Sequence, residues 1–128
     1  MLFRSYTGYR QKADQVKYDL LGFLIAQKKA GKSVMAYGAA AKGNTLLNYC
    51  GVKPDLIDFV VDANPHKQNK FMPASHIPIK GKDAIAEAKP DFVLILPWNL
   101  KKEITEQLSY CREWGAQFVI PIPELEIL

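Results

Sequence analysis

The first quarter of the chain carries the pattern of an amphipathic helix. From Gln11 to Lys29, apolar residues recur at steps of three and four, the spacing that gathers side chains on one face of an α-helix. Gly31 follows and ends the predicted helix. An apolar face needs a covering surface, so we predict a helical segment over residues 1–32 that packs on a domain of residues 33–128 or on a partner. The apolar positions are Ala13, Val16, Leu20, Phe23, Leu24 and Ala30.

After this helix, short apolar runs alternate with segments of helical pattern. Residues 91–96 form the most continuous apolar run, which is typical of a central strand covered on both faces. Alternating strands and helices build parallel crossover units. We therefore predict an α/β fold, a Rossmann-like doubly wound parallel sheet of about five strands in three α/β/α layers. The predicted strands are residues 33–37, 57–62, 77–79, 91–96 and 117–120, the predicted helices are residues 44–50, 82–88 and 100–111, and the prolines after residue 120 end regular structure.

This topology predicts where a ligand would bind. In open sheets of this class, ligands lie beyond the carboxyl ends of the strands, near the point where the strand order reverses. In this sequence, those ends carry residues 38–43, Asp62, residues 97–99 and residues 121–124. These four places hold the candidate binding residues.

A glycine-containing segment follows the first predicted strand and opens a helix. Gly38 permits a tight turn, and Gly43 lets the helix pack close to the strand. Ala40 stands where a glycine normally lets the backbone approach a pyrophosphate, which argues against a closely bound dinucleotide. Asp62, 19 positions after Gly43, is placed to accept from ribose hydroxyls and keeps a nucleotide ligand open. The segment is Gly38, Ala39, Ala40, Ala41, Lys42 and Gly43.

The same segment is close to a phosphate-binding Walker A loop, but Asn44 occupies the lysine position, so phosphoryl transfer is not supported. An anion site remains. The backbone N–H groups of Gly43 to Thr45 would donate at a helix N-terminus, with Lys42 adding positive charge. The alternative is a structural turn that only packs the strand on its helix.

The loop after the second predicted strand carries His66, Lys67 and Lys70, and Phe71 follows them. It is either a solvated loop or a segment that folds over a ligand, with a lysine on a phosphate and Phe71 on a base or a partner surface. His66 and His76 have no acid or cysteine at ligand spacing, so no metal site is predicted. His66 has a suitable pKa for a general base, but no neighbouring residue supports that role.

Trp98 and Asn99 directly follow the central strand. A large aromatic side chain and an amide at a strand's carboxyl end favour an inward-facing edge of a binding site. The alternative is a helix N-cap beside a core tryptophan. No nucleophile elbow, paired carboxylates or Ser/His/Asp array is present in the sequence, so the chain indicates a binding module without complete catalytic machinery.

Composition and charge narrow the class of protein. The chain has 128 residues, 48% of them hydrophobic and 23% charged, which is one globular domain's worth. The net charge of +4 comes from residues 1–32, because the rest has ten Lys and Arg against eleven Asp and Glu. We expect a basic helix face that meets solvent or another domain, not nucleic acid. Two distant cysteines indicate a reducing compartment, and no membrane-length apolar run or signal peptide is present, so we expect a cytoplasmic, soluble protein.

Several stretches resemble a known family, the C-terminal domain of S-adenosylmethionine-dependent C-methyltransferases that act on nucleotide-linked deoxysugars. The Gly-Ala-Ala-Ala-Lys-Gly-Asn-Thr and Pro-Trp-Asn blocks are the most specific. The matching stretches are residues 37–48, 61–62, 64–68, 76–79, 91–99 and 118–124.

The resemblance implies that catalysis and binding of the sugar nucleotide are carried out by different domains. Full-length members have a cysteine-rich zinc domain and a methyltransferase domain that holds S-adenosylmethionine, and the family's catalytic residues lie mainly there. No cysteine cluster or second glycine loop occurs here, so we expect no cofactor in this chain and S-adenosylmethionine in the missing methyltransferase domain. This chain would bind the sugar nucleotide and help close the cleft, with that domain as its partner. The implied binding residues are Gly38 to Thr45, Asp62, His66, Lys67, Trp98 and Asn99.

Two positions depart from the family's pattern. Asn69 and Ala74 stand where the family tends to have glycine. Asparagine tolerates a left-handed backbone but alanine does so poorly, so the conformation of the loop through Ser75 is open. Two other functions also stay open, a stand-alone nucleotide-binding or sensing module and a purely structural association domain.

Overall fold

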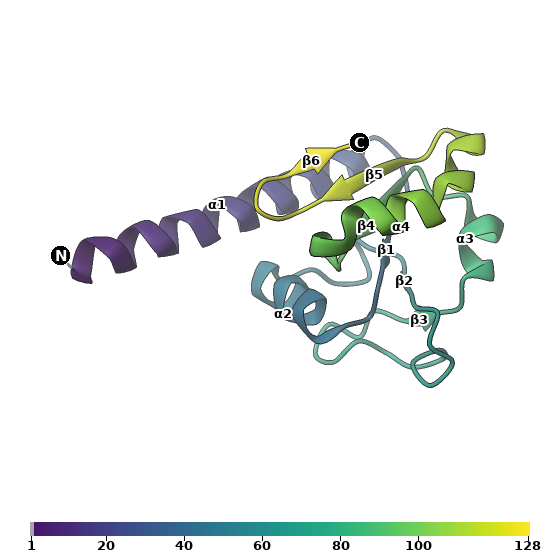
Figure 1. Ribbon diagram of the computed structural model, residues 1–128, viewed down its shortest axis with the longest axis horizontal. Coiled ribbons are helices and arrows are strands. Elements are labelled where there is room, and N and C mark those ends of the chain that lie inside the picture. The colour runs from purple at the N-terminus through teal and green to yellow at the C-terminus, as the bar shows by residue number, and fades with distance from the viewer. Residues whose placement is uncertain (1) are drawn as a thin grey trace.

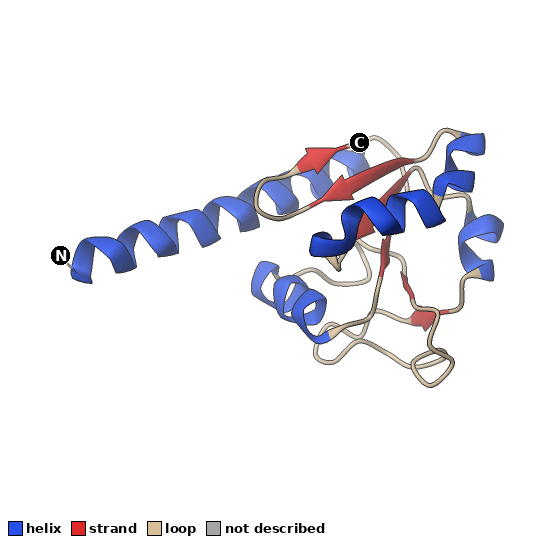
Figure 2. Ribbon diagram, viewed as in Figure 1, coloured by secondary structure: helices blue, strands red, loops and turns tan. Residues whose placement is uncertain are grey.

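The structure is a computed structural model that describes residues 2–128, with side chains from Lys12 onward. A sheet lies between two layers of helices (Figure 1; Figure 2). The strand order is β3-β2-β1-β4-β5-β6, in which β6 is antiparallel to β5 and all other pairs are parallel. The strands are β1 (Val34–Tyr37), β2 (Val60–Val61), β3 (Ile79–Lys80), β4 (Phe92–Ile95), β5 (Gln117–Ile120) and β6 (Glu126–Ile127). The helices are α1 (Leu2–Lys29), α2 (Ala41–Cys50), α3 (Asp83–Ala88) and α4 (Lys101–Gln107), with 3-10 helices η1 (Trp98–Leu100) and η2 (Ser109–Trp114).

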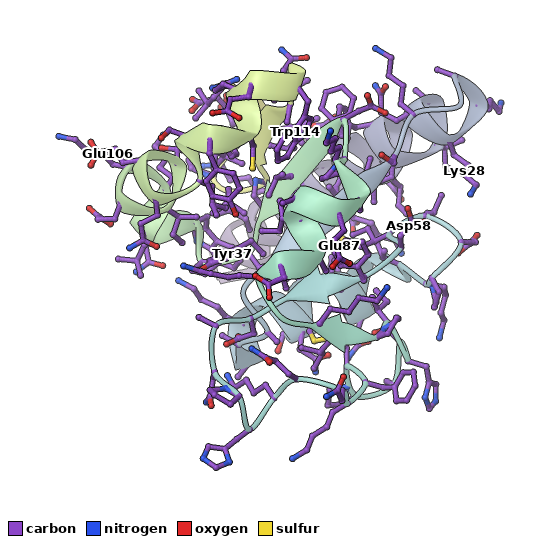
Figure 3. The ribbon with its side chains drawn as sticks, turned by 90° about the vertical axis from the view of Figure 1, so that its right-hand side faces the viewer. Lys28, Tyr37, Asp58, Glu87, Glu106 and Trp114 are labelled. Carbon is purple, nitrogen blue, oxygen red and sulfur yellow. The ribbon has the colours of Figure 1, made fainter. Side chains whose placement is uncertain are left out.

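Alternating side chains of the central strands form two apolar cores, one on each face of the sheet. On β4, Leu94 packs in the core with α1 and α2, whereas Val93 and Ile95 pack in the core with α4. In Figure 3, α1, marked by Lys28, and α4, marked by Glu106, lie on opposite sides of the strands. Every residue of β1 and β4 is buried, so the predicted central strand and the three-layer fold are confirmed.

Helix α1 begins earlier than the apolar pattern predicted. It starts at Leu2, and its N-terminal half extends beyond the sheet (Figure 1). Its C-terminal half is covered by the strands, where Leu20 and Leu24 are buried and the Phe23 ring meets Phe92 edge to face at 5.0 Å between centroids. This half therefore shares one core with the sheet. The division of the chain at residue 32 stays a prediction.

Two segments near the C-terminus differ from the predicted pattern. The helix expected after Pro97 is divided into η1, α4 and η2, because tighter bonds such as that from Cys111 N–H to Leu108 O (2.9 Å) interrupt the α-helical ladder. Regular structure also continues after the prolines. The chain turns back, and Phe118 and Leu128 exchange backbone N–H···O bonds of 3.1 and 2.8 Å. The sheet therefore has six strands, not five.

The loop between β2 and β3 contains three non-glycine residues with a left-handed backbone, of which His76 (φ 60°) is one. Asn69 has a φ of 63° and Ala74 a φ of 67°. Ser75, which follows Ala74, is buried. The loop thus keeps a conformation suited to glycine at both positions where the sequence departs from the family's pattern.

Candidate functional site

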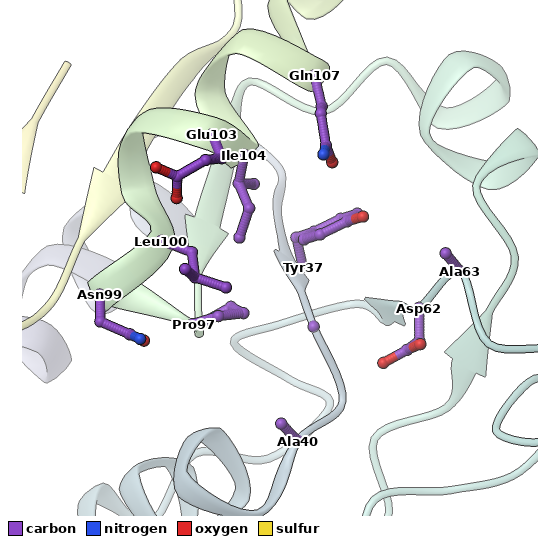
Figure 4. Close-up of a pocket in the computed structure, with 11 residues that line it drawn as sticks. Tyr37, Ala40, Asp62, Ala63, Pro97, Asn99, Leu100, Glu103, Ile104 and Gln107 are labelled. Carbon is purple, nitrogen blue, oxygen red and sulfur yellow. The ribbon is translucent and has the colours of Figure 1, made fainter.

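A cavity of about 490 Å³ lies at the carboxyl edge of the sheet, where β1 stands between β2 and β4 and the strand order reverses. We call it the central cavity (Figure 4). The ends of the three strands and the helix after β4 form its wall. It is lined by Tyr37, Gly38, Ala40, Asp62, Ala63, Pro97, Asn99, Leu100, Glu103, Ile104 and Gln107.

The two glycines of the loop are required by close packing. Gly38 has a φ of 96°, and a Cβ there would lie 2.7 Å from two side-chain atoms of Pro97. A Cβ on Gly43 would lie 2.8 Å from the Leu96 Cβ, so the first turn of α2 approaches the end of β4 closely. The turn role predicted for Gly38 is present, and the close packing predicted for Gly43 is made with Leu96 at the end of β4 and not with the first strand.

The Asp62 carboxylate fixes the backbone of the glycine loop. Oδ2 accepts from the Ala39 N–H at 2.8 Å, and Oδ1 accepts from the Asn64 N–H at 2.8 Å. Its side chain is 15% exposed and lines the central cavity. Each carboxylate oxygen has two lone pairs, so one remains on each oxygen. A contact between Asp62 and a ligand hydroxyl stays a prediction.

The segment after Asp62 is tied back onto the same loop. Lys67 Nζ donates to the Ala39 carbonyl at 3.0 Å and lies 4.0 Å from Asp62 Oδ2. Gln68 Nε2 donates to the Asp62 carbonyl at 3.0 Å. His66 is exposed, and its backbone N–H is bonded to Asn64 Oδ1 at 3.0 Å. The structure therefore brings the predicted loop residues to the glycine loop.

A second cavity, of about 340 Å³, lies under this segment; we call it the loop cavity. Ala40 lines both cavities, so the glycine loop stands between them. Lys70 carries no ion pair or side-chain hydrogen bond within the described residues, and Phe71 is 63% exposed. The residues lining it are Ala39, Ala40, Ala41, Asn44, His66, Lys67, Lys70, Phe71, Met72, Pro73 and Ile79.

The N-terminus of α2 differs from the sequence prediction. The helix begins at Ala41, three residues earlier than expected, and the Asn44 N–H donates to the Ala40 carbonyl at 3.0 Å. The N–H groups without an acceptor among the described residues are those of Ala41, Lys42 and Gly43. Gly43 is common to this set and to the predicted donors, whereas the N–H groups of Ala41 and Lys42 take the place of those of Asn44 and Thr45.

Thr45 and Asn44, both in the first half of α2, differ in their hydrogen bonding. Thr45 Oγ1 donates back to the Ala41 carbonyl at 3.0 Å, within its own helix. Asn44 lines the loop cavity, and its buried Oδ1 has no partner in the described part of the chain. Asn44 is therefore the polar side chain of α2 with unused hydrogen-bonding capacity at a cavity.

Lys42 joins α2 to the segment after β4. Its Nζ donates to Asn99 Oδ1 and lies 4.6 Å from the centroid of the half-buried Trp98 ring. This cation–π contact and hydrogen bond occupy the Lys42 ammonium group. Asn99 is not the predicted N-cap, because it lies inside η1 and its side chain accepts from Lys42.

Sequence reasoning missed the α4 side of the central cavity and the residue at the end of β1. Glu103 and Gln107 follow Asn99 at steps of four, which places all three on one helix face. This spacing of polar residues could have predicted that helix face from the sequence.

Tyr37 is the residue at the end of β1. Burial, and secondarily the negative charge of Asp62, raises the pKa of Tyr37, so its hydroxyl stays protonated at neutral pH.

Within the described residues, no group of three or more His, Cys, Asp or Glu side chains is placed to hold a metal ion. Both cysteines are free and buried. None of the described helices is both long enough and apolar enough to cross a bilayer.

Residues 2–123 match the family model for the C-methyltransferase C-terminal domain. The chain belongs to this family. The C-methyltransferase NovU of Streptomyces niveus is 40% identical to it over 98 residues, which are 77% of this chain and 23% of that protein. The resemblance found in the sequence is confirmed, and the chain spans less than a quarter of this relative's length.

The UDP-D-quinovosamine 4-dehydrogenase of Vibrio fischeri is a solved structure with a similar fold. It aligns with a TM-score of 0.53 at 21% identity, covering 76% of this chain and 93% of that one. At this identity the likeness concerns the fold alone. It confirms the Rossmann-like architecture of this C-methyltransferase C-terminal domain.

Proposed function

We propose that this domain binds the nucleotide-linked deoxysugar substrate of a C-methyltransferase and covers one side of the reaction cleft. The observation that carries the proposal is the pair of cavities on either side of Ala40, at the reversal point of the sheet. Ligands of open α/β sheets bind at this place.

The loop cavity is suited to the ligand's phosphates. His66, Lys67 and Lys70 line it, together with the start of α2. Lys67 is already bonded to the Ala39 carbonyl, so Lys70 is the cation available for a charge-assisted hydrogen bond. The free N–H groups at the start of α2 and the helix dipole add to the attraction for an anion.

This chain's own glycine loop fits S-adenosylmethionine poorly. The Ala40 methyl stands where a cofactor would need close backbone approach, and Asp62 is bonded to two backbone N–H groups. We assign the methyl donor to a separate methyltransferase domain, outside the residues that the structure describes. Methyl transfer to carbon needs a nucleophile protected from water, and a domain that covers the sugar nucleotide excludes water from the reacting carbon.

The connection to that domain is assigned to α1. Its N-terminal half extends beyond the sheet, and the relative NovU is much longer than this chain. Basic residues are concentrated in this segment of the sequence, which favours contact with an acidic surface. We expect weak nucleotide affinity in the isolated chain and higher affinity when a methyltransferase domain is added.

Calorimetric titration with thymidine diphosphate tests the phosphate assignment. Replacing Lys70 by Gln removes the uncommitted cation, and we expect about a three- to tenfold loss of affinity, the effect of one exposed charge-assisted hydrogen bond. Lys29→Gln removes the same charge at the opposite end of the sheet, where α1 leads into β1, and should leave the affinity unchanged.

Two results would count against the proposal. If the chain does not bind thymidine diphosphate, either alone or with a methyltransferase domain added, the glycine loop has only a structural role in packing. Tighter binding of NAD than of thymidine diphosphate would favour a sensing module. A loss of affinity on raising the salt concentration is expected, because exposed charges are screened.

A further inference from the structure

The two cavities differ in charge. Three cationic or potentially cationic side chains line the loop cavity, whereas the central cavity has none among its lining residues and carries Asp62 and Glu103. A phosphate in the central cavity would therefore meet like charge. An uncharged ring with hydrogen-bonding groups fits the central cavity better.

Tyr37 supplies a fixed hydroxyl to the central cavity. Its residue is 9% exposed, and its ring packs in the core formed with α4 while the residue also lines the cavity. The close-up view shows Gln107 reaching from α4 toward the Tyr37 side chain (Figure 4). Neither side chain has a hydrogen-bond partner among the residues that the structure describes.

Polar groups at the wall of a cavity that have no protein partner can exchange their contact with water for a hydrogen bond to a ligand. The tyrosine hydroxyl can donate one hydrogen bond and also accept one. The glutamine side chain donates through its NH2 group and accepts through its amide oxygen. Together they suit a ligand hydroxyl or keto oxygen. Tyr37 is also held rigidly by the buried strand β1, so its hydroxyl keeps one position.

We propose that the central cavity binds the uncharged, hydroxylated sugar ring of the ligand, with Tyr37 Oη and the Gln107 amide as its hydrogen-bonding partners. The inference rests on the proposed function, which places the phosphates at the loop cavity. Because Ala40 lines both cavities, one ligand can extend from one to the other across the glycine loop. Tyr37 and Gln107 then determine specificity for the sugar, and the cations determine affinity for the diphosphate.

The test compares two probes, thymidine diphosphate and thymidine-diphosphoglucose, in calorimetric titrations of the chain. We expect the sugar-bearing probe to bind more tightly to the unmodified chain. Tyr37→Phe keeps the ring in the core and removes the hydroxyl. It should weaken thymidine-diphosphoglucose binding about three- to tenfold, the effect of one net hydrogen bond, and leave thymidine diphosphate binding unchanged.

Matched variants separate this effect from folding. Gln107→Ala should show the same selective loss, and Glu106→Ala, its exposed neighbour that points away from Tyr37 in Figure 3, should not. Tyr18→Phe removes an exposed hydroxyl on α1 as the control for Tyr37→Phe.

The outcomes distinguish this inference from the proposed function. If the unmodified chain binds neither probe, either alone or with a methyltransferase domain added, the proposed function fails. If both probes bind equally well, the function stands and the sugar assignment is overturned. If Tyr37→Phe weakens both probes by the same factor, the hydroxyl contacts the nucleoside and the assignment to the sugar ring is also overturned.

Discussion

The Asp62 carboxylate at the end of β2 accepts a hydrogen bond of 2.8 Å from the backbone N–H of Ala39, 23 positions earlier in the chain. This bond fixes the turn between β1 and α2, and Lys67 supports it from the other side by donating to the Ala39 carbonyl at 3.0 Å. The acid at this position therefore organises the loop that separates the two cavities.

Replacing Asp62 by Asn should destabilise the fold. The amide offers one oxygen where the carboxylate offers two, so an NH2 group would face either the Ala39 or the Asn64 N–H. We expect a loss of about 1–3 kcal/mol in the free energy of unfolding, measured by urea denaturation. Asp55→Asn is the control, because Asp55 is exposed and no described side chain pairs with it. Equal stability of the two variants would show that the Asp62 bonds are not stabilising.

The close contact of Gly43 with Leu96 predicts opposite effects for two Gly→Ala substitutions. At Gly43 the added Cβ would lie 2.8 Å from the Leu96 Cβ, and overpacking of this kind costs about 1–3 kcal/mol. At Gly22, in the interior of α1, nothing lies within 4 Å, and alanine should stabilise the helix by about 0.5–1 kcal/mol. Thermal unfolding should show a lower Tm for Gly43→Ala and a higher Tm for Gly22→Ala. Two shifts of the same sign would be inconsistent with the packing described.

Ala74 is strained by its positive φ of 67°. Glycine adopts this conformation without the steric cost of a Cβ, so Ala74→Gly should raise the free energy of unfolding, by up to about 1 kcal/mol. The comparison is Ala86→Gly in the exposed part of α3, which should lower it by a similar amount. A destabilised Ala74→Gly variant would contradict the left-handed backbone at this position.

The two thiols should be unreactive in the folded chain. Burial raises the pKa of Cys50 and of Cys111 from 9.0 to about 11, against the smaller opposing effects of Lys17 and Arg112. At pH 8 only about one thiol in a thousand is then ionised, and the thiolate is the reactive form. Ellman's reagent should titrate two thiols in denaturant and none rapidly in buffer. A fast-reacting thiol in the folded chain would contradict the burial of that cysteine.

The raised pKa values of Cys50 and Cys111 make the stability of the fold depend on pH. The folded state favours the neutral thiols, whereas the unfolded thiols ionise near pH 9. The free energy of unfolding should therefore fall as the pH rises from about 9 to 11. A Cys111→Ser variant would lack part of this dependence.

The sequence pattern predicted the order of the helices and strands well, because each buried element needs apolar residues at regular positions. The strand at residues 92–95 is fully buried, and its short continuous apolar run is typical of such a strand. Strand β6 was missed, since two exposed residues carry too little periodicity to be recognised. The start of α2 was misplaced because Ala41 and Lys42 are compatible with either a turn or a helix, and only packing against Leu96 decides between them.

The candidate site was predicted in part. The glycine loop, Asp62 and the residues after β4 lie together, because the carboxyl ends of parallel strands meet at one edge. The partners of individual side chains could not be predicted. Lys42 is bonded to Asn99, 57 positions away, and that contact depends on how α2 sits against η1. Tyr37 was overlooked because a tyrosine in a buried strand has the pattern of a core residue.

The central claim, that the paired cavities bind a nucleotide-linked sugar, is tested most directly by following backbone amide shifts in NMR spectra during titration with thymidine-diphosphoglucose. The account predicts shifts at Ala41 to Gly43 and at Lys67 to Phe71, which border the loop cavity, with NAD causing little change. Shifts confined to other surfaces, or larger shifts with NAD at these same amides, would contradict the account.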